Sequence, residues 1–290
     1  MYQSLLFIPA NKEKMLKKAE TTEADSVIFD LEDSILETDK TEARTILYSF
    51  LRTHLNSGRK KLIVRINQLD TYGGDDANVL CKFSGINAFM LPKATVEDVK
   101  SLDNLLKEKE KENNLKPGCF NIVPLIESPE SLLDARDISM ASERITGILF
   151  GAEDYTSCMN LNRTTEGTEI FYARSFLAIV CAAAGIDAID TPCTEITDKK
   201  IIEEDARNAK KLGMTGKAAI HPGQLPIINK VFRPDEDELK KAKEIIEATQ
   251  KSNEGSFSVN GKMVDLPIIE KAKKILETVE NMDDITHKIK

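Results

Sequence analysis

Eight short apolar segments, each followed by a longer segment with helical periodicity, limit most strongly how this chain can fold. This alternation is typical of β-α units repeated around a parallel sheet. Eight units close into a TIM barrel, whereas an open dinucleotide-binding sheet would begin with a glycine-rich turn, and the first turn here, IPANKE, has none. The predicted strands are residues 4–9, 25–32, 61–67, 88–93, 120–127, 145–154, 187–192 and 216–222. The sequence therefore predicts the α/β fold class and a (β/α)8 barrel.

The chain continues well beyond the eighth predicted strand. We expect a barrel domain at residues 1–232 and a C-terminal segment at 233–290. In the second part the pattern predicts a helix that ends near Gly255, a hairpin at FSVNGKMVD and a last helix at PIIEKAKKILETVEN. Because the barrel is complete without this segment, we expect it to act as a lid or as a contact between subunits.

Composition excludes several classes of partner and location. The net charge is −8 and no dense basic block is present, which argues against nucleic-acid binding. No apolar segment approaches the roughly 20 residues of a membrane span, and the N-terminus lacks the layout of a signal peptide. The sequence therefore predicts a cytoplasmic protein without a membrane partner. Its five cysteines are widely spaced without a CxxC pair, which disfavours a disulfide framework and a structural zinc site.

Polar residues end most of the predicted strands. In a TIM barrel the C-terminal ends of the strands form the working face. The candidate site residues are therefore Asp30, Glu32, Asp33, Arg65, Asn67, Lys93, Glu127, Glu153, Asp154, Asp190 and His221. Most of them are acids, and one arginine and one lysine could serve as partners for an anion.

Two of the acids, Glu127 and Asp154, follow neighbouring predicted strands. Two carboxylates with open positions between them suit Mg²⁺, which prefers oxygen ligands and keeps several waters. The alternative is that Glu127 caps the following helix and Asp154 caps its own loop, and the spacing favours neither interpretation. Zinc is a weaker hypothesis, because none of the three histidines has a second His or Cys at ligand spacing.

Three basic or titratable residues each have two interpretations. Arg65 lies inside an apolar strand and could hold a substrate carboxylate or pair with Glu32 or Asp33. Lys93 could form a Schiff base, but its position beside the next helix favours a structural ion pair. His221 could act as acid, base or phosphate contact, although a lone histidine beside proline is more often a packed residue.

Several motifs together resemble one known family nearly from end to end. They are LLFIPANKEKMLKKA, DSVIFDLEDSI, VRIN, MLPK, PLIESP, GAEDYT, EIFYARSFLAIVCAAAGIDAID, LGMTGKAAIHPGQL and GKMVDLP. In this order they resemble the citrate lyase beta-subunit group of the aldolase and citrate lyase superfamily, which includes malyl-CoA and citramalyl-CoA lyases.

The resemblance implies a Mg²⁺-dependent carbon–carbon lyase that cleaves a 3-hydroxyacyl thioester, such as citryl thioester, into oxaloacetate and acetyl thioester. It implies that Glu127 and Asp154 hold the metal, with Glu127 also beside the substrate, and that Arg65 binds the oxoacid carboxylate. Asp265, in the GKMVD motif, would handle the proton on the acetyl carbon from a neighbouring subunit of a trimer or hexamer. The residues expected around this site without holding the metal are Glu32, Asp33, Lys93, Glu153 and His221.

The sequence leaves the natural thioester open. GAEDY with NRTTEGTEIFYAR is similar to true citrate lyase beta subunits, whereas AIHPGQ is similar to stand-alone CoA-thioester lyases. The acyl carrier is therefore CoA or a carrier protein, and other citrate lyase subunits are possible partners. Ala10 stands where many family members have glycine. The alternatives are a malyl-CoA or citramalyl-CoA lyase, a non-catalytic barrel subunit of a larger complex, and a Schiff-base aldolase that uses Lys93.

Overall fold

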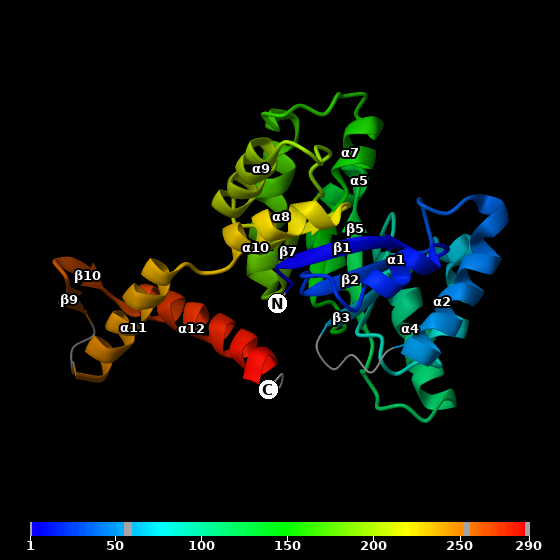
Figure 1. The fold of residues 1–290 in the computed structure, drawn as a ribbon, viewed down its shortest axis with the longest axis horizontal. Helices are drawn as coiled ribbons and strands as arrows, with labels where there is room; N and C mark the ends of the chain where they lie inside the picture. Colours follow the sequence, from blue (N-terminus) through cyan, green and yellow to red (C-terminus); the bar gives the residue numbers. More distant parts are fainter. Residues whose placement is uncertain (1, 55–59, 252–255, 288–290) are drawn as a thin grey trace. The chain divides into compact units, whose positions relative to one another are not determined.

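The computed structural model describes residues 2–54, 60–251 and 256–287, and the chain forms two compact units, Met1–Phe232 and Arg233–Lys290 (Figure 1). Each unit has its own packed elements. The first contains the strands predicted to form the barrel, and the second contains the segment that follows them.

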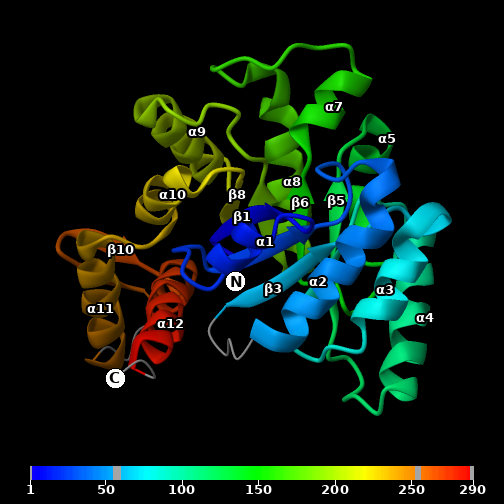
Figure 2. The same ribbon diagram turned by 45° about the vertical axis from the view of Figure 1, so that its right-hand side comes forward.

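Eight parallel strands of the first unit pair in the order of the sequence, and the last pairs with the first, so that the barrel closes (Figure 2). The strands are β1 Ser4–Pro9, β2 Ser26–Asp30, β3 Lys61–Arg65, β4 Ala88–Leu91, β5 Asn121–Ile126, β6 Gly147–Phe150, β7 Asp187–Asp190 and β8 Gly216–Ala219. Closure pairs Ser4 of β1 with Lys217 of β8. The predicted TIM barrel is confirmed.

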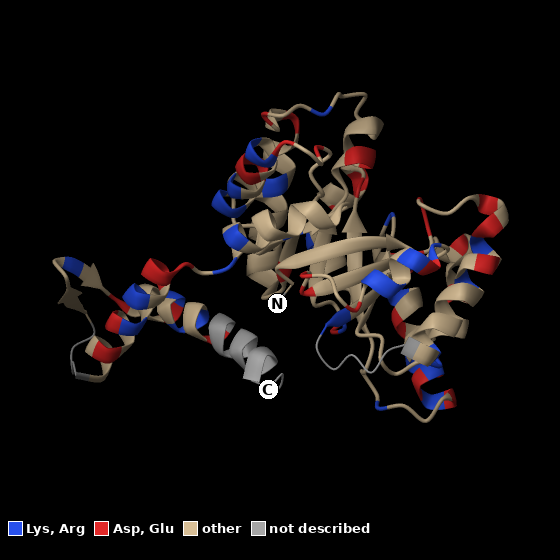
Figure 3. Ribbon diagram, viewed as in Figure 1, with Lys and Arg blue, Asp and Glu red and all other residues tan. Residues whose placement is uncertain are grey.

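Helices surround the strands and follow the predicted alternation. They are α1 Glu13–Lys18, α2 Lys40–His54, α3 Gly74–Leu80, α4 Val96–Glu112, α5 Pro129–Leu133, α6 Ala135–Ser139, α7 Ala152–Cys158, α8 Phe171–Ala184, α9 Lys199–Lys211 and α10 Leu225–Phe232, with short helical turns at Glu37–Asp39, Leu69–Gly73, Thr168–Ile170 and Pro222–Gln224. Local capping sets several ends, because the Thr95 side chain accepts from Asp98 N–H at the start of α4, and Gly185, with φ of 70°, ends α8. Acidic and basic residues are mixed along the outer helices (Figure 3).

Alternation along each strand divides the core into two layers. Leu5, Ile28, Ile63 and Leu125 belong to the cluster inside the barrel, whereas intervening residues such as Val64 pack toward the helices. Because side chains alternate along a strand, a residue two positions beyond an inner one also faces inward. This alternation brings the ends of several strands together at the carboxyl-terminal face of the barrel.

The first strand matches its predicted bounds, and the other seven end before their predicted carboxyl ends. The largest difference is at the sixth strand, predicted over 145–154, because β6 ends at Phe150 and helix α7 begins at Ala152. Glu153 and Asp154 therefore lie in the first turn of a helix, where acidic side chains interact favourably with the helix dipole.

The second unit consists of two helices and a hairpin. Helix α11 spans Glu236–Lys251, strands β9 Phe257–Val259 and β10 Lys262–Val264 pair antiparallel, and α12 spans Leu266–His287. Asn260 and Gly261 turn the hairpin with φ of 51° and 77°, as an Asn-Gly turn requires. The predicted end of the first helix near Gly255 lies outside the described residues. None of the described helices is both long and apolar enough to cross a membrane.

Candidate active site

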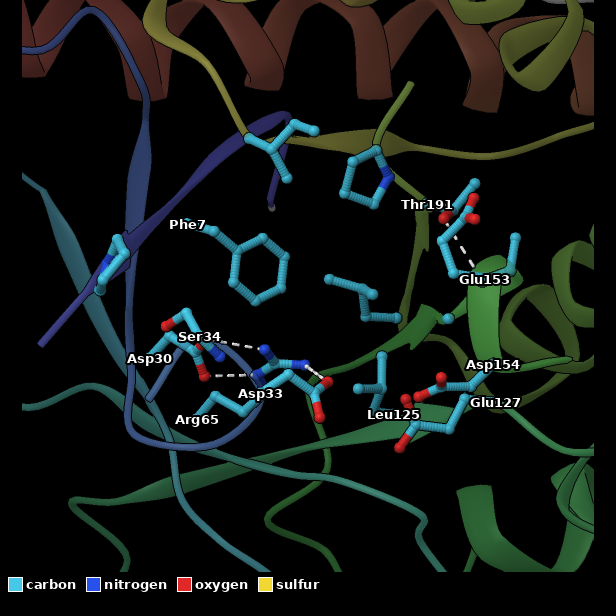
Figure 4. A pocket seen from close by; sticks show the side chains of 16 residues that line it. Phe7, Asp30, Asp33, Ser34, Arg65, Leu125, Glu127, Glu153, Asp154 and Thr191 are labelled. Atoms are coloured by element: carbon cyan, nitrogen blue, oxygen red, sulfur yellow. Dashed lines mark hydrogen bonds and ion pairs between the residues drawn. The ribbon is translucent and has the colours of Figure 1, made fainter. Parts of the chain in front are cut away.

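A cavity of about 440 Å³ opens at the carboxyl ends of the barrel strands. Its polar lining includes Asp30, Asp33, Arg65, Glu127, Glu153 and Asp154, and Figure 4 shows these side chains around one space. The strand ends of the barrel thus gather six of the predicted candidate residues, although they lie far apart in the sequence.

Glu127 follows β5 and is held from two sides. It is 3% exposed, and its Oε1 accepts a hydrogen bond of 2.6 Å from the backbone N–H of Lys93. Lys93 has φ of 46°, a left-handed conformation that is strained for a residue with a side chain and is often found at functional sites. On the other side, a Cβ on Gly151 would lie 2.9 Å from Glu127 Oε2 and 2.6 Å from Glu127 Cβ, so only glycine fits there.

The carboxylates of Glu127 and Asp154 lie next to each other in the cavity (Figure 4). The pKa of Glu127 is raised to about 8. Burial is the main cause, the negative charges of Glu32 and Asp154 add to it, and the hydrogen bond from Lys93 N–H opposes it. Two crowded carboxylates of this kind are the oxygen donors that a hard divalent cation prefers. The donor set and the narrow space beside Gly151 therefore fit Mg²⁺.

The capping alternative for Glu127 does not agree with the geometry. Ser128 is the N-cap of α5, since its side chain accepts from Ser131 N–H at 3.0 Å, and Glu127 is not used for this purpose. Among the described residues, no group of three or more His, Cys, Asp and Glu side chains is gathered to hold a metal. A Mg²⁺ ion at Glu127 and Asp154 would take its remaining ligands from water or substrate.

Arg65, at the end of β3, faces inward and is surrounded by acids. Its Nε and Nη2 donate to the two carboxylate oxygens of Asp30 at 2.6 and 2.7 Å. Its Nη1 lies 3.0 Å from both Glu32 Oε2 and Asp33 Oδ2, and its guanidinium stacks 5.0 Å from the ring centre of Phe7. Burial would lower the pKa of Arg65, but the carboxylates outweigh it and raise the pKa. The main partner, Asp30, had no place among the pairings that the sequence suggested for Arg65.

Lys93 and Glu153 each form an ion pair near the cavity. Lys93 Nζ lies 3.2 Å from Glu32 Oε1. Burial lowers the pKa of Lys93, but Glu32 outweighs it and raises the pKa, so that the amine stays protonated and is a poor Schiff-base nucleophile. Glu153 lines the cavity but points its carboxylate to Arg163, 2.6 Å away.

Other predicted site residues lie elsewhere. His221 is exposed and its Nδ1 accepts from Gly223 N–H at 3.1 Å, so it caps a short helical turn. Asn67 donates its side-chain amide to Asp76 at 2.7 Å. Asp265 belongs to the second unit, where its carbonyl accepts from Ile268 and Ile269 N–H in the first turn of α12, and its catalytic role stays a prediction.

Asp190 ends β7 on the outer side of the barrel wall. It is fully buried and receives two hydrogen bonds from Arg174, at 2.8 and 3.0 Å, and one from Lys217. Its neighbour Thr191 lines the cavity instead. Sequence reasoning missed Thr191 and Lys217, although the alternation along β7 and β8 could have placed Asp190 and Lys217 on the same outer face.

Comparison with known proteins places this architecture in one family. The sequence model of HpcH/HpaI aldolase/citrate lyase matches residues 3–222. The citrate lyase subunit beta of Leuconostoc mesenteroides subsp. cremoris is 35% identical over 95% of this chain and 92% of its own length. The L-malyl-CoA/beta-methylmalyl-CoA lyase of Cereibacter sphaeroides is 31% identical over 95% of this chain and 93% of its own length.

A solved structure extends the similarity to three dimensions. The protein CitE from Mycobacterium tuberculosis, in complex with magnesium, acetoacetate and coenzyme A, is 29% identical and has a TM-score of 0.75. The similarity covers 95% of this chain and 97% of that one. The family predicted from the sequence motifs is confirmed, and this chain belongs to the HpcH/HpaI aldolase/citrate lyase family.

Proposed function

We propose that this protein is a Mg²⁺-dependent carbon–carbon lyase that cleaves citryl thioester into oxaloacetate and acetyl thioester. The observation that carries the proposal is the pair of carboxylates formed by the buried Glu127 and the partly buried Asp154 in one cavity with Arg65. The names of the relatives, a citrate lyase subunit and a malyl-CoA lyase, support the reaction class, and the magnesium complex of the M. tuberculosis protein supports the metal.

Glu127 and Asp154 would hold the metal ion. Bound there, Mg²⁺ supplies a Lewis acid for the substrate hydroxyl that becomes a carbonyl. The strained backbone of Lys93 and the missing side chain of Gly151 keep the Glu127 carboxylate in one orientation. Such preorganisation means that little rearrangement is needed when the substrate enters.

Arg65 would orient the oxoacid half of the substrate. Its Nε and Nη2 are both committed to Asp30, so a substrate carboxylate must approach through Nη1. Asp33 contacts that same nitrogen from a half-exposed position, whereas Asp30 and Glu32 are buried. We expect the substrate carboxylate to replace Asp33 at Arg65 and to bind through this one nitrogen.

The departing half of the substrate needs a proton. Breaking the carbon–carbon bond leaves its electron pair on the carbon next to the thioester, as an enolate, and this carbon must be protonated before release. We assign the proton to Asp265 as general acid, on the strength of the GKMVD motif. In the condensation direction the same carboxylate would remove the proton.

The assembly and the carrier form part of the same proposal. We place Asp265 in the site of a neighbouring subunit of a trimer or hexamer, with residues 233–290 acting as a lid. The coenzyme A in the M. tuberculosis complex supports a CoA thioester, and the name citrate lyase subunit beta supports partner subunits and a carrier-protein thioester. A cytoplasmic location agrees with such substrates.

Malyl-CoA or citramalyl-CoA cleavage is the second candidate. It is favoured by the 31% identity to the L-malyl-CoA/beta-methylmalyl-CoA lyase over nearly the whole chain. Both candidates use the same residues in the same roles, and they differ in the oxoacid that the cavity accepts. A non-catalytic barrel subunit is the remaining alternative.

The test is an assay of the purified protein with citryl-CoA, malyl-CoA and citramalyl-CoA, with Mg²⁺ and with EDTA. We expect Mg²⁺-dependent cleavage with citryl-CoA preferred. Glu127→Gln should lower the rate by more than about 100-fold, beyond the 10- to 100-fold typical of residues that only support a ligand. No cleavage of any of the three thioesters, or full activity of Glu127→Gln, contradicts the proposal.

A further inference from the structure

We infer that Thr191 is a positioning residue for Asp154, because it caps the helix that carries this carboxylate and is itself fixed by a buried ion network centred on Lys217. The inference rests on the proposed metal role of Asp154. It concerns the wall of the cavity opposite Arg65, formed by the ends of β6 and β7 (Figure 4).

Helix α7 lacks a cap of its own. Its N-cap residue, Gly151, has no side chain that could accept a hydrogen bond from the first turn. Gly151 cannot be replaced by Ser, Thr or Asp, because any Cβ would collide with Glu127. The close approach of the glutamate therefore removes the usual means of satisfying the first N–H groups of a helix.

Thr191 supplies the missing acceptor from the next strand. Its Oγ1 accepts a hydrogen bond of 3.3 Å from the N–H of Ala152, the first residue of α7, and both residues are buried. The preceding N–H, of Gly151, donates to Ile126 O at 2.8 Å. The turn between β6 and α7 is thus held by the end of β5, next to Glu127, and by the end of β7. Asp154 lies two residues after this attachment.

Thr191 is anchored from behind the barrel wall. Its carbonyl accepts a hydrogen bond of 2.7 Å from Lys217 Nζ. Lys217 is completely buried and also pairs with Asp190 and with Asp205, 2.7 Å away. Arg174 completes the set, because it donates to Asp190 and to Asp205 at 2.6 Å. Two cations and two carboxylates balance each other, and all four side chains converge behind Thr191.

A network of this kind is weak evidence for stability, because well-packed apolar residues in its place are often as stabilising. Its specific effect is to fix the position of the chain where Lys217 bonds to the carbonyl of Thr191. Since the same residue touches α7 through its hydroxyl, the network is connected to the Asp154 carboxylate by a short series of bonds.

The test compares three variants of the full-length protein by calorimetric titration with Mg²⁺ alone. Thr191→Val keeps the shape and removes the acceptor, and we expect about 10- to 100-fold weaker Mg²⁺ binding, as for residues that support metal ligands. Thr191→Ser keeps the hydroxyl and should restore most of the affinity. Thr191→Ala removes the hydroxyl without a new methyl contact and should repeat the loss if Thr191→Val does not fold.

Thr215→Val is a matched control, because the Thr215 hydroxyl accepts from Ala188 N–H at 3.0 Å at the other end of β7. It should lower the melting temperature without changing the Mg²⁺ affinity. If Thr191→Val also loses only stability and keeps wild-type Mg²⁺ affinity, Thr191 is merely structural and the inference is wrong.

Mg²⁺ binding by Glu127→Gln and Asp154→Asn distinguishes a failure of the positioning role of Thr191 from a failure of the proposed metal site. If both bind Mg²⁺ as tightly as wild type, the metal site itself is misassigned. If both lose Mg²⁺ and Thr191→Val does not, the metal site stands and only the positioning role fails.

Discussion

Glu127 is held in place by two neighbours that the sequence could not connect to it. That it faces into the barrel follows from alternation along β5, because Leu125 two residues earlier is an inner residue. The left-handed conformation of Lys93 and the need for glycine at 151 depend on contacts between three separate loops. Sequence could therefore identify the carboxylate as a candidate but could not show what fixes its orientation.

The raised pKa of Glu127 predicts that Mg²⁺ binding depends on pH. Burial raises this pKa to about 8, so below this pH the metal must displace a proton from the carboxyl group. We expect the affinity to fall by up to about tenfold for each pH unit below that value. Calorimetric titration across a pH series in buffers of different ionisation enthalpy measures both the affinity and the released proton. A constant affinity with no proton release would show that Glu127 is already ionised.

Because Asp33 contacts Arg65 from a half-exposed position, removing the Asp33 side chain should change how tightly the substrate carboxylate binds. Asp33→Ala should tighten the binding of oxaloacetate by up to about fivefold, since exposed ion pairs contribute about 0.2–1 kcal/mol. The measurement is the inhibition constant of oxaloacetate. Asp75→Ala is the control, because Asp75 is an exposed acid near the buried Arg44, with 4.0 Å between the charged atoms, and it does not line the cavity. Weaker oxaloacetate binding in Asp33→Ala contradicts the replacement of Asp33 by substrate.

Among the elements, the long helices were the easiest to predict and α7 the hardest. Helix α4 has several turns of apolar residues at helical spacing and a capping threonine. Helix α7 has seven residues, too few to establish a period, and the apolar run of β6 leads directly into it. Its acids were therefore assigned to the end of a strand, although the candidate residues themselves were unaffected.

The ion pair between Glu110 of helix α4 and Arg144 predicts that the stability of the protein falls in acid. Burial raises the pKa of Glu110, but two hydrogen bonds from Arg144, with help from the N–H groups of Gly118 and Phe120, lower it to about 2. Because the folded pKa lies below the ordinary value of 4.5, the stabilisation is complete above 4.5 and is lost as the pH falls toward 2.

The variant Glu110→Gln tests this pair. It should destabilise the protein at neutral pH by about 1.5–3 kcal/mol, because the charge-assisted hydrogen bonds to Glu110 are lost while Arg144 keeps its ion pair with Asp103, 2.7 Å away. It should also flatten the loss of stability on acidification. Urea unfolding at a series of pH values measures both effects, and an unchanged acid profile would mean that other carboxylates dominate acid unfolding.

For the whole molecule, the repeated β-α pattern was sufficient to predict the closed barrel, because eight short strands leave few other ways to bury both faces. No comparable local sequence pattern predicts where the second unit lies relative to the barrel. Asp265 illustrates the difference: its motif is recognisable, but the role we propose for it in a neighbouring subunit depends on how subunits would assemble. Local periodicity thus determines the architecture, while assembly depends on surfaces that no single segment encodes.

Mixing two inactive variants tests whether Asp265 acts on a neighbouring subunit. Glu127→Gln and Asp265→Asn should each be inactive alone. After the two are mixed, unfolded and refolded together, a site built from the intact barrel of one chain and the intact tail of the other should regain activity. Random assembly of equal amounts in a ring would restore about a quarter of the sites. No recovery, with mixed oligomers present, means that Asp265 works within its own chain or not at all.

The hydrogen bond from Lys93 N–H to Glu127 Oε1 also has a consequence for ion selectivity. With one oxygen committed to the backbone, the carboxylate has a single oxygen to offer a metal. Ca²⁺ often takes carboxylates through both oxygens and accepts seven or eight ligands, whereas Mg²⁺ takes six at shorter distances. We therefore expect Ca²⁺ to support much less cleavage than Mg²⁺ at equal concentration, which a metal-replacement assay measures. One backbone amide in a strained loop would then help the protein to discriminate between the two commonest divalent ions of the cell.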